Sequence, residues 1–174
     1  MKDLLTADIM RAALQALDEK LAQKLSLIIG GGGAMLLAHG YPLATTDIDA
    51  IPKGMEIGEL DIYVKKIAAE KNLPIDWLNP YFSTFSFTLP MDYQDRLIQV
   101  FSGKNLSAHA LGKEDLLVMK CFAHRQKDIG HAKKLIKDGA NLELVEDQIQ
   151  GLLEKKVRGA QEALDFFDEL TENI

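Results

Sequence analysis

Two aspartates separated by one residue, Asp47 and Asp49, stand at the start of a β-prone segment, residues 46–52. Alternate residues of a strand share a face, so the two carboxylates point the same way. Like charges this close repel each other unless a cation lies between them, and Mg²⁺ takes a few carboxylate oxygens together with water and phosphate. The pair therefore predicts a nucleotide–metal site. The alternative is two solvated aspartates on an edge strand, and the apolar neighbours Ile48 and Ile51 argue against it.

Four consecutive glycines, 30–33, lie between the apolar run LSLII and the segment AMLLAHG. Glycines between a strand and a helix let the backbone approach a ligand, and a helix N-terminus offers N–H groups and a positive dipole end to an anion. The cluster is neither a Gly-Lys-Ser/Thr phosphate loop nor a GxGxxG fingerprint, because position 35 or 36 would have to be glycine. A tight turn without a ligand is the alternative.

The stretch IIGGGGAMLLAHGYPLATTDIDAI resembles the signature of the nucleotidyltransferase (polymerase-beta-like) superfamily. In that signature a strand leads to Gly-Gly and a short helix, and a loop then leads to a strand with Asp-x-Asp. The resemblance is strongest to minimal AbiEii-type toxins and related uncharacterised bacterial nucleotidyltransferases. Their GGxA and Thr-x-Asp-Ile-Asp stretches match residues 31–34 and 45–49 here.

A second block, EDLLVMKCFAHRQKDIGHAKKL, is similar to the family's helix pattern Leu-x-x-Lys-x-x-Ala-x-Arg-x-x-Asp. The matching polar residues are Lys120, Arg125 and Asp128. The resemblance implies that Lys120 and Arg125 donate charge-assisted hydrogen bonds to triphosphate oxygens. The alternative is a surface helix that carries basic residues.

The resemblance also implies a mechanism. Gly31, Gly32, Gly33 and Thr46 would bind a nucleoside triphosphate, and the two aspartates would act in catalysis by holding Mg²⁺ against its phosphates. An acceptor hydroxyl would attack the α-phosphate and release pyrophosphate. RNA, a protein or a small molecule is the implied acceptor, and toxin-type relatives imply an antitoxin partner. The alternative function is a catalytically degenerate nucleotide-binding or protein-interaction module.

Three departures from the family pattern keep that alternative open. The loop before the Asp-x-Asp strand lacks the arginine found in many relatives. Active transferases place a third carboxylate on a neighbouring strand, and in the expected strand 96–101 that position holds Gln99, whose amide cannot act as a general base. Asp95 and Asp76 are the candidate replacements. His131 stands where relatives repeat an acid, three residues after Asp128.

The pattern of apolar residues predicts an α/β (α+β) fold with a mixed sheet, flanking helices and a helical C-terminal part. The expected helices are 3–23, capped by Thr6, 34–40, 56–72, 113–125, 127–138 and one or two after residue 142. The expected strands are 25–30, 46–52 ended by Pro52, a strand or hairpin over 75–88, and 96–101. We expect residues 1–111 to form the sheet domain and 112–174 a helical part packed on it as one unit.

Composition predicts a cytoplasmic protein without a membrane segment. The one cysteine permits no intramolecular disulfide, and the acidic N-terminus has no apolar signal core. A net charge of −6 argues against strong nonspecific binding of nucleic acid. The charge is uneven, with seven Lys/Arg and three acids over residues 113–137, then nine acids and three bases from Glu143 onward. An anionic ligand near the basic stretch and two solvated helix faces are the alternatives.

Overall fold

The computed structural model describes residues 4–80, 86–172 and 174. By its internal contacts the chain divides into two compact units. The sheet unit comprises residues 1–83 and 97–111, and the helical unit comprises residues 84–96 and 112–174. Residues 84–96, which lie before the last two strands in sequence, thus group with the C-terminal helices.

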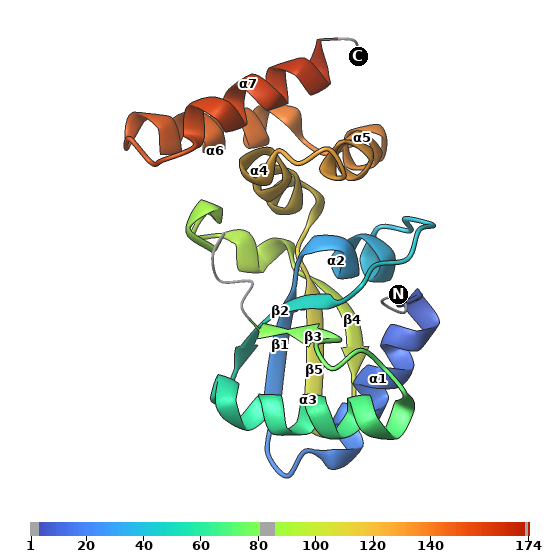
Figure 1. Ribbon diagram of the computed structural model, residues 1–174. Coiled ribbons are helices and arrows are strands. Elements are labelled where there is room, and N and C mark those ends of the chain that lie inside the picture. Colours follow the sequence, from blue (N-terminus) through green and yellow to red (C-terminus); the bar gives the residue numbers. More distant parts are fainter. Residues whose placement is uncertain (1–3, 81–85, 173) are drawn as a thin grey trace. The chain divides into compact units, whose positions relative to one another are not determined.

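The secondary structure is mixed α/β, as the sequence predicts (Figure 1). The helices are α1 (Ala7–Lys20), α2 (Gly31–Ala38), α3 (Ile57–Lys71), a 3-10 helix (Tyr93–Arg96), α4 (Lys113–Ala123), α5 (Asp128–Lys137), α6 (Leu142–Glu154) and α7 (Ala160–Thr171). The strands are β1 (Leu25–Ile29), β2 (Ile48–Lys53), β3 (Leu78–Asn79), β4 (Ile98–Ser102) and β5 (Leu106–Ala110).

The five strands form one mixed sheet in the order β3-β2-β1-β5-β4. Strand β1 pairs antiparallel with β2 and parallel with β5, so β1 and β5 lie side by side within the sheet (Figure 1). Strand β3 runs parallel to β2 and β4 antiparallel to β5. The sequence LSAHA of β5 was not assigned to a strand in our prediction, because its small side chains and lone leucine give a weak β signal.

One face of the sheet is the apolar core of this unit, since residues at alternate positions are almost fully buried. This face consists of Leu25, Leu27, Ile29, Ile48, Ala50, Leu106, Ala108 and Ala110. Helix α1 packs against α3 and β5, and α2 packs against β2 and β4. The opposite face is only half-buried at Ser26, Asp49, Ile51, Ser107 and His109. Asp49 therefore projects from the half-open face of the sheet.

The local predictions hold for most elements and fail at two. The Thr6 side chain caps α1 by accepting a hydrogen bond from the Ile9 N–H at 3.3 Å, as predicted. Pro52 does not end its strand: it lies within β2 opposite Leu27. Because β3 pairs with β2 only at Ile48 and Asp49, the rest of β2 is an edge, where proline is tolerated.

The strand or hairpin predicted over residues 75–88 is also wrong in extent. Its ordered strand is the two-residue β3, and residues 86–88 form a 3-10 turn. Residues 81–85 of this prediction lie outside the described residues.

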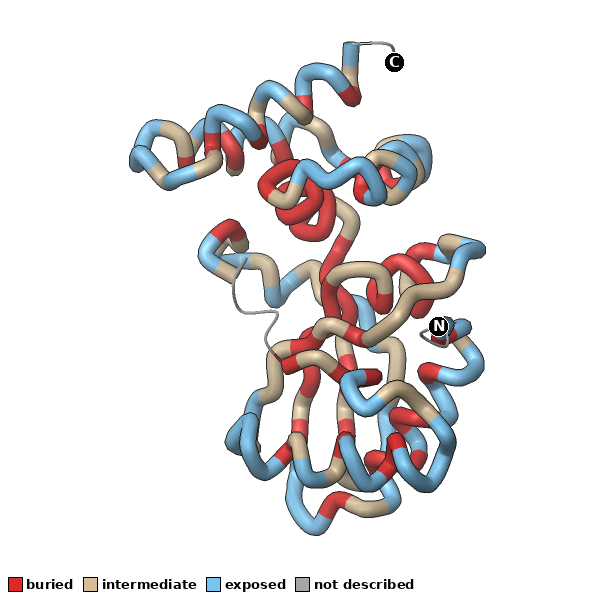
Figure 2. The backbone as a smooth tube through the Cα atoms, viewed as in Figure 1, coloured by how far each residue is buried: buried red, intermediate tan, exposed pale blue. Residues whose placement is uncertain are grey.

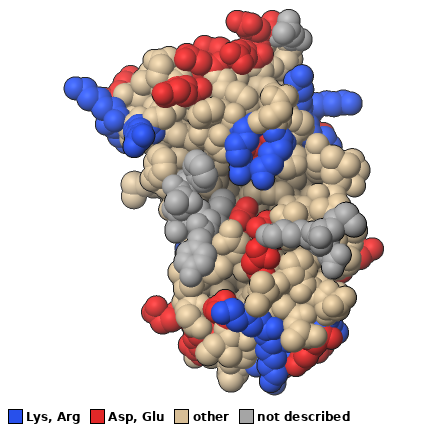
Figure 3. All heavy atoms as spheres, in the orientation of Figure 1, with Lys and Arg blue, Asp and Glu red and all other residues tan. Residues whose placement is uncertain are grey.

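In the helical unit, α4 is the central element and packs against α5, α6 and α7. Its residues 115–122 are all buried, so the tube in Figure 2 is red along most of this helix. The acidic side chains of α7 gather on the surface instead (Figure 3); they are Glu162, Asp165, Asp168 and Glu169. The C-terminal acids are therefore a solvated helix face.

Candidate functional site

Gly30 is the one residue between β1 and α2, and Gly31, Gly32 and Gly33 form the first turn of α2, which therefore begins three residues before the predicted start at Ala34. The Gly30 N–H donates to the Asp49 carbonyl at 2.9 Å, which extends the β1–β2 pairing by one residue. Gly31 then has φ +55°, in the left-handed region where residues with a Cβ are strained. This conformation turns the chain out of the strand and directly into α2.

The same turn packs tightly against the acidic segment of β2. A Cβ on Gly31 would lie 2.4 Å from Asp49 Oδ2, and a Cβ on Gly32 would lie 2.7 Å from Thr45 Oγ1. A Cβ on Gly33 would lie 3.3 Å from the Ile29 side chain. Side chains at the first two positions would displace the loop, so the glycines are what brings the two sequence motifs into contact.

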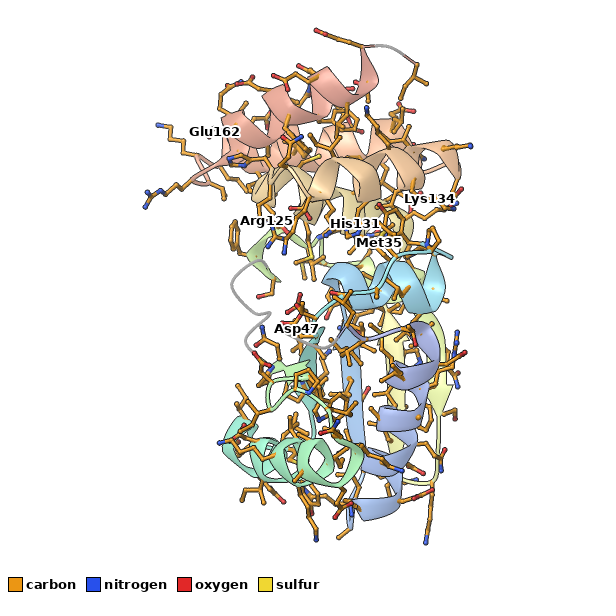
Figure 4. All side chains as sticks on the ribbon, turned by 45° about the vertical axis from the view of Figure 1, so that its right-hand side comes forward. Met35, Asp47, Arg125, His131, Lys134 and Glu162 are labelled. Carbon is orange, nitrogen blue, oxygen red and sulfur yellow. The ribbon has the colours of Figure 1, made fainter. Side chains whose placement is uncertain are left out.

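The loop before β2 is tied to the N-terminal segment. The Leu5 N–H donates to the Thr45 carbonyl at 2.6 Å, and the Thr45 N–H donates back to the Leu5 carbonyl at 3.1 Å. Thr46 and Asp47 follow and are half-buried. Asp47, labelled in Figure 4, lies directly before β2. The structure thus sets Gly31 and Gly32 against Asp49 and Thr45, and the predicted site residues Thr46 and Asp47 lie between these two along the chain.

The first turn of α2 can bind an anion. Gly30 is its N-cap and makes no side-chain capping bond, and no acidic residue lies in the first turn. The first N–H groups of an α-helix lack intrahelical partners and carry the positive end of the dipole. Phosphate oxygens are suitable acceptors for such groups.

The strand beside β2 contributes Asn79, which our sequence analysis did not single out. Parallel pairing sets Asn79 opposite Asp49, and the Asn79 amide Nδ2 donates to Asp49 Oδ1 at 3.1 Å. Strand pairing was the missing information, because β3 has only two residues and weak periodicity. The sequence pattern Leu-Asn-Pro alone reads as a turn.

Gln99 is not on the strand next to the aspartates, and this corrects our prediction. It is exposed on β4, at the opposite edge of the sheet from β3, where it pairs with His109. The prediction took strand 96–101 as the neighbouring strand of the family pattern and did not include β5, which lies between β4 and β1. The neighbouring-strand position belongs to Asn79. Of the proposed replacements, Asp76 is exposed just before β3 and Asp95 lies in the 3-10 helix of the helical unit.

The acidic pair fits a single Mg²⁺ ion that arrives with a nucleotide. In the described part of the chain no three His, Cys, Asp or Glu side chains are grouped to hold a metal ion. Mg²⁺ is commonly bound by one or two carboxylates, with substrate phosphates and water completing six oxygen ligands. Asp47, directly before β2, and Asp49, within it, supply that number of carboxylates, and the first turn of α2 lies against Asp49.

In the helical unit, Lys120 and Arg125 both bind Asp128. Lys120 Nζ donates to Asp128 Oδ1 and Arg125 Nε to Asp128 Oδ2, each at 2.7 Å. Lys120 is 4% exposed and Asp128 is fully buried, whereas the Arg125 side chain is 51% exposed. The Lys120 ammonium thus has a partner inside this unit, and the role of both cations in nucleotide binding stays a prediction.

This cluster has perturbed ionisation. Burial raises the pKa of Asp128, but the hydrogen bond from Arg125 and the charge of Lys120 outweigh it, so the pKa lies below the ordinary range. Burial lowers the pKa of Lys120, and Asp128 opposes this shift. Burial, and then the Lys120 charge, lower the pKa of the adjacent His131 to about 4. His131, labelled with Arg125 in Figure 4, is therefore neutral at pH 7.

The glycine turn, the paired aspartates and the Lys–Arg–Asp cluster all fall within a recognised family. A family model described as "Nucleotidyltransferase of unknown function (DUF6036)" matches residues 7–165. The chain belongs to this family. The match covers both units, so the resemblance to nucleotidyltransferases is confirmed. The closer relation to AbiEii-type toxins stays a prediction.

Comparisons with curated proteins and with solved structures give no match. In the described residues, no helix has the length and apolar character needed to cross a membrane.

Proposed function

We propose that the protein transfers a nucleotidyl group from a nucleoside triphosphate to a hydroxyl acceptor in a Mg²⁺-dependent reaction. The observation that carries this proposal is the contact between the glycine turn and Asp49, with 2.4 Å between Asp49 Oδ2 and a Cβ built on Gly31. This contact supports the proposal because a helix N-terminus suited to phosphate adjoins a carboxylate suited to Mg²⁺. Membership of the family supports the same reaction class.

In the proposed reaction, the N–H groups of Gly31, Gly32 and Gly33 bind the outer phosphates, with Thr46 beside them. Asp47 and Asp49 hold Mg²⁺, which supplies neutralisation of the triphosphate charge. The acceptor oxygen forms a bond to the α-phosphorus while the bond to the β-phosphate oxygen breaks, and pyrophosphate leaves. The acceptor proton passes to water or to a carboxylate. The protein contributes positioning and charge.

The proposal also concerns the chemical class of the acceptor. The resemblance to toxin-type relatives favours an RNA or a protein hydroxyl, and a small molecule is the alternative. A toxin-type role would add an antitoxin partner. Arg125 is half-exposed and is the proposed phosphate contact of the helical unit. Lys120 is buried and forms an ion pair with Asp128, which also binds Arg125.

The test is label transfer from each of the four α-³²P-labelled ribonucleoside triphosphates to total RNA or to cell lysate, with and without Mg²⁺. We expect transfer with one or more triphosphates in the presence of Mg²⁺. Asp47→Asn and Asp49→Asn should each reduce transfer by at least about 100-fold, because each removes a metal-binding charge. Digestion with RNase or protease then identifies the acceptor class.

The matched control is Asp8→Asn, which removes one carboxylate from an exposed position on α1. It should leave transfer unchanged. An absence of transfer, combined with no nucleotide–Mg²⁺ thermal shift, would sink the proposal. Nucleotide binding without transfer would favour the alternative, a degenerate nucleotide-binding module.

A further inference from the structure

The contact between Asn79 and Asp49 joins two strands at the end of the sheet that carries the glycine turn. Asn79 is half-buried, and its amide donates to Asp49 Oδ1 at 3.1 Å. The other oxygen of the same carboxylate, Oδ2, faces the Gly31 turn. One oxygen of Asp49 thus accepts from an amide on β3, and the other lies against Gly31 at the start of α2.

We propose that Asn79 is a positioning residue that orients Asp49 and, as a neutral amide, limits the site to one divalent cation per bound nucleotide. This inference rests on the proposed function. A side chain that hydrogen-bonds a metal-binding carboxylate fixes its orientation and its basicity. The register-paired position beside Asp49 is the place at which a third carboxylate would add the negative charge that a second ion needs.

Charge supports the limit of one ion. Two carboxylates carry a charge of −2, which balances one divalent cation. Two cations about 4 Å apart repel each other strongly, and sites that hold such pairs place shared carboxylates between them. Asn79 offers an amide dipole at this position, which cannot offset a second cation to the same extent.

The experiment measures Mn²⁺ binding by electron paramagnetic resonance, with the α,β-imido analogues of ATP, GTP, CTP and UTP as probes. The full chain should bind one Mn²⁺ with the analogue it prefers. Asn79→Ala should weaken Mn²⁺ binding at least about 10-fold, as expected when a partner of a metal ligand is removed. Asn79→Asp should bind one additional Mn²⁺, because it adds a third carboxylate.

The matched control is Gln99→Ala, an exposed amide on the opposite edge strand, which should bind Mn²⁺ as the original chain does. Circular dichroism melting of each variant identifies any loss of folding, and the Asn79→Asp gain in Mn²⁺ cannot arise from unfolding. Two Mn²⁺ ions in the original chain, unchanged affinity in Asn79→Ala, or unchanged stoichiometry in Asn79→Asp would overturn this inference. Failure of the original chain to bind Mn²⁺ with any analogue would instead overturn the proposed function.

Discussion

At the scale of single residues, Gly31 has two separate reasons to be glycine. Its φ of +55° costs a residue with a Cβ about 1–2 kcal/mol. The space where a Cβ would go is occupied by Asp49 Oδ2, at 2.4 Å. Backbone conformation and the position of a proposed metal ligand therefore depend on the same residue.

The substitution Gly31→Ala should lower stability and ligand binding together. We expect a loss of about 1–2 kcal/mol in the free energy of unfolding from the backbone strain. We also expect a weaker nucleotide–Mg²⁺ thermal shift, because Asp49 has to move. Urea unfolding and melting curves with nucleotide measure the two effects.

The control is Gly58→Ala, in the first turn of α3, where a Cβ would meet nothing within 4 Å. It should be neutral or stabilise by up to about 1 kcal/mol, since alanine is the better helix former. A Gly31→Ala variant that matched Gly58→Ala in both measurements would contradict the role assigned to this turn.

At the scale of elements, α1 is joined to the β4–β5 turn by one buried carboxylate. Asp18 on α1 accepts the backbone N–H of Asn105 and of Leu106, each at 2.7 Å, and that of Lys104 at 3.0 Å. A Cβ on Gly103 would lie within 2.4 Å of this carboxylate. Burial raises the pKa of Asp18, but the three N–H donors outweigh burial and lower it.

This arrangement predicts a pH-dependent stability. Because the folded pKa lies below the ordinary value of 3.8, the contribution of Asp18 is fully present above that value and is lost as the pH falls through the folded pKa. Asp18→Asn should lower the free energy of unfolding at pH 7 by about 3 kcal/mol, as a charged acceptor is removed. The difference from the original chain should shrink as the pH falls below about 4.

Urea unfolding between pH 2 and pH 7 measures this dependence. The neighbouring Glu19 is exposed, so Glu19→Gln is a control that should track the original chain at every pH. Parallel stability curves for Asp18→Asn and the original chain would show that the carboxylate charge contributes nothing.

At the scale of the whole molecule, the chain enters the helical unit twice, and its first segment there is 84–96. Arg96 donates to the buried Asp115 carboxylate at 2.8 and 2.9 Å and to Asp92 at 2.9 and 3.0 Å. The Phe87 ring meets Phe122 edge to face, with 5.8 Å between ring centroids. Hydrogen bonds to Asp115, and then to Asp92, raise the pKa of Arg96, so it remains charged.

Arg96→Met should therefore destabilise the helical unit selectively. Asp115 is 1% exposed, and removing its cation leaves a buried carboxylate without its counter-charge, which costs about 3–5 kcal/mol. Hydrogen–deuterium exchange should accelerate in peptides from α4, α6 and α7 more than in peptides from β1 and β2. Arg11→Met, at an exposed arginine on α1, is the control and should change neither. Faster exchange confined to peptides from the sheet unit would contradict the grouping of residues 84–96 with the helical unit.

Local sequence determined the parts of this protein that depend on neighbouring residues. Gly31 specifies a turn because few other residues adopt its positive φ, and the spacing of Asp47 and Asp49 keeps the two carboxylates close along the chain, with Asp47 directly before β2 and Asp49 within it. Apolar periodicity of 3.6 residues specified α1 and α3–α7. The family signature was recognisable for the same reason, since its motifs are short and continuous.

Strand pairing was decided by tertiary structure. The sequence of β5 is too weakly apolar to reveal a strand, yet it pairs with β1 in the interior of the sheet, which sends β4 and Gln99 to the far edge. Asn79 meets Asp49 only because β3 pairs with β2, 30 residues along the chain. Likewise, the sequence left open whether Lys120 binds phosphate or lies on a surface helix, and its burial against Asp128 was decided by how α4 packs. Long-range pairing and burial depend on the whole core, so no short stretch of sequence encodes them.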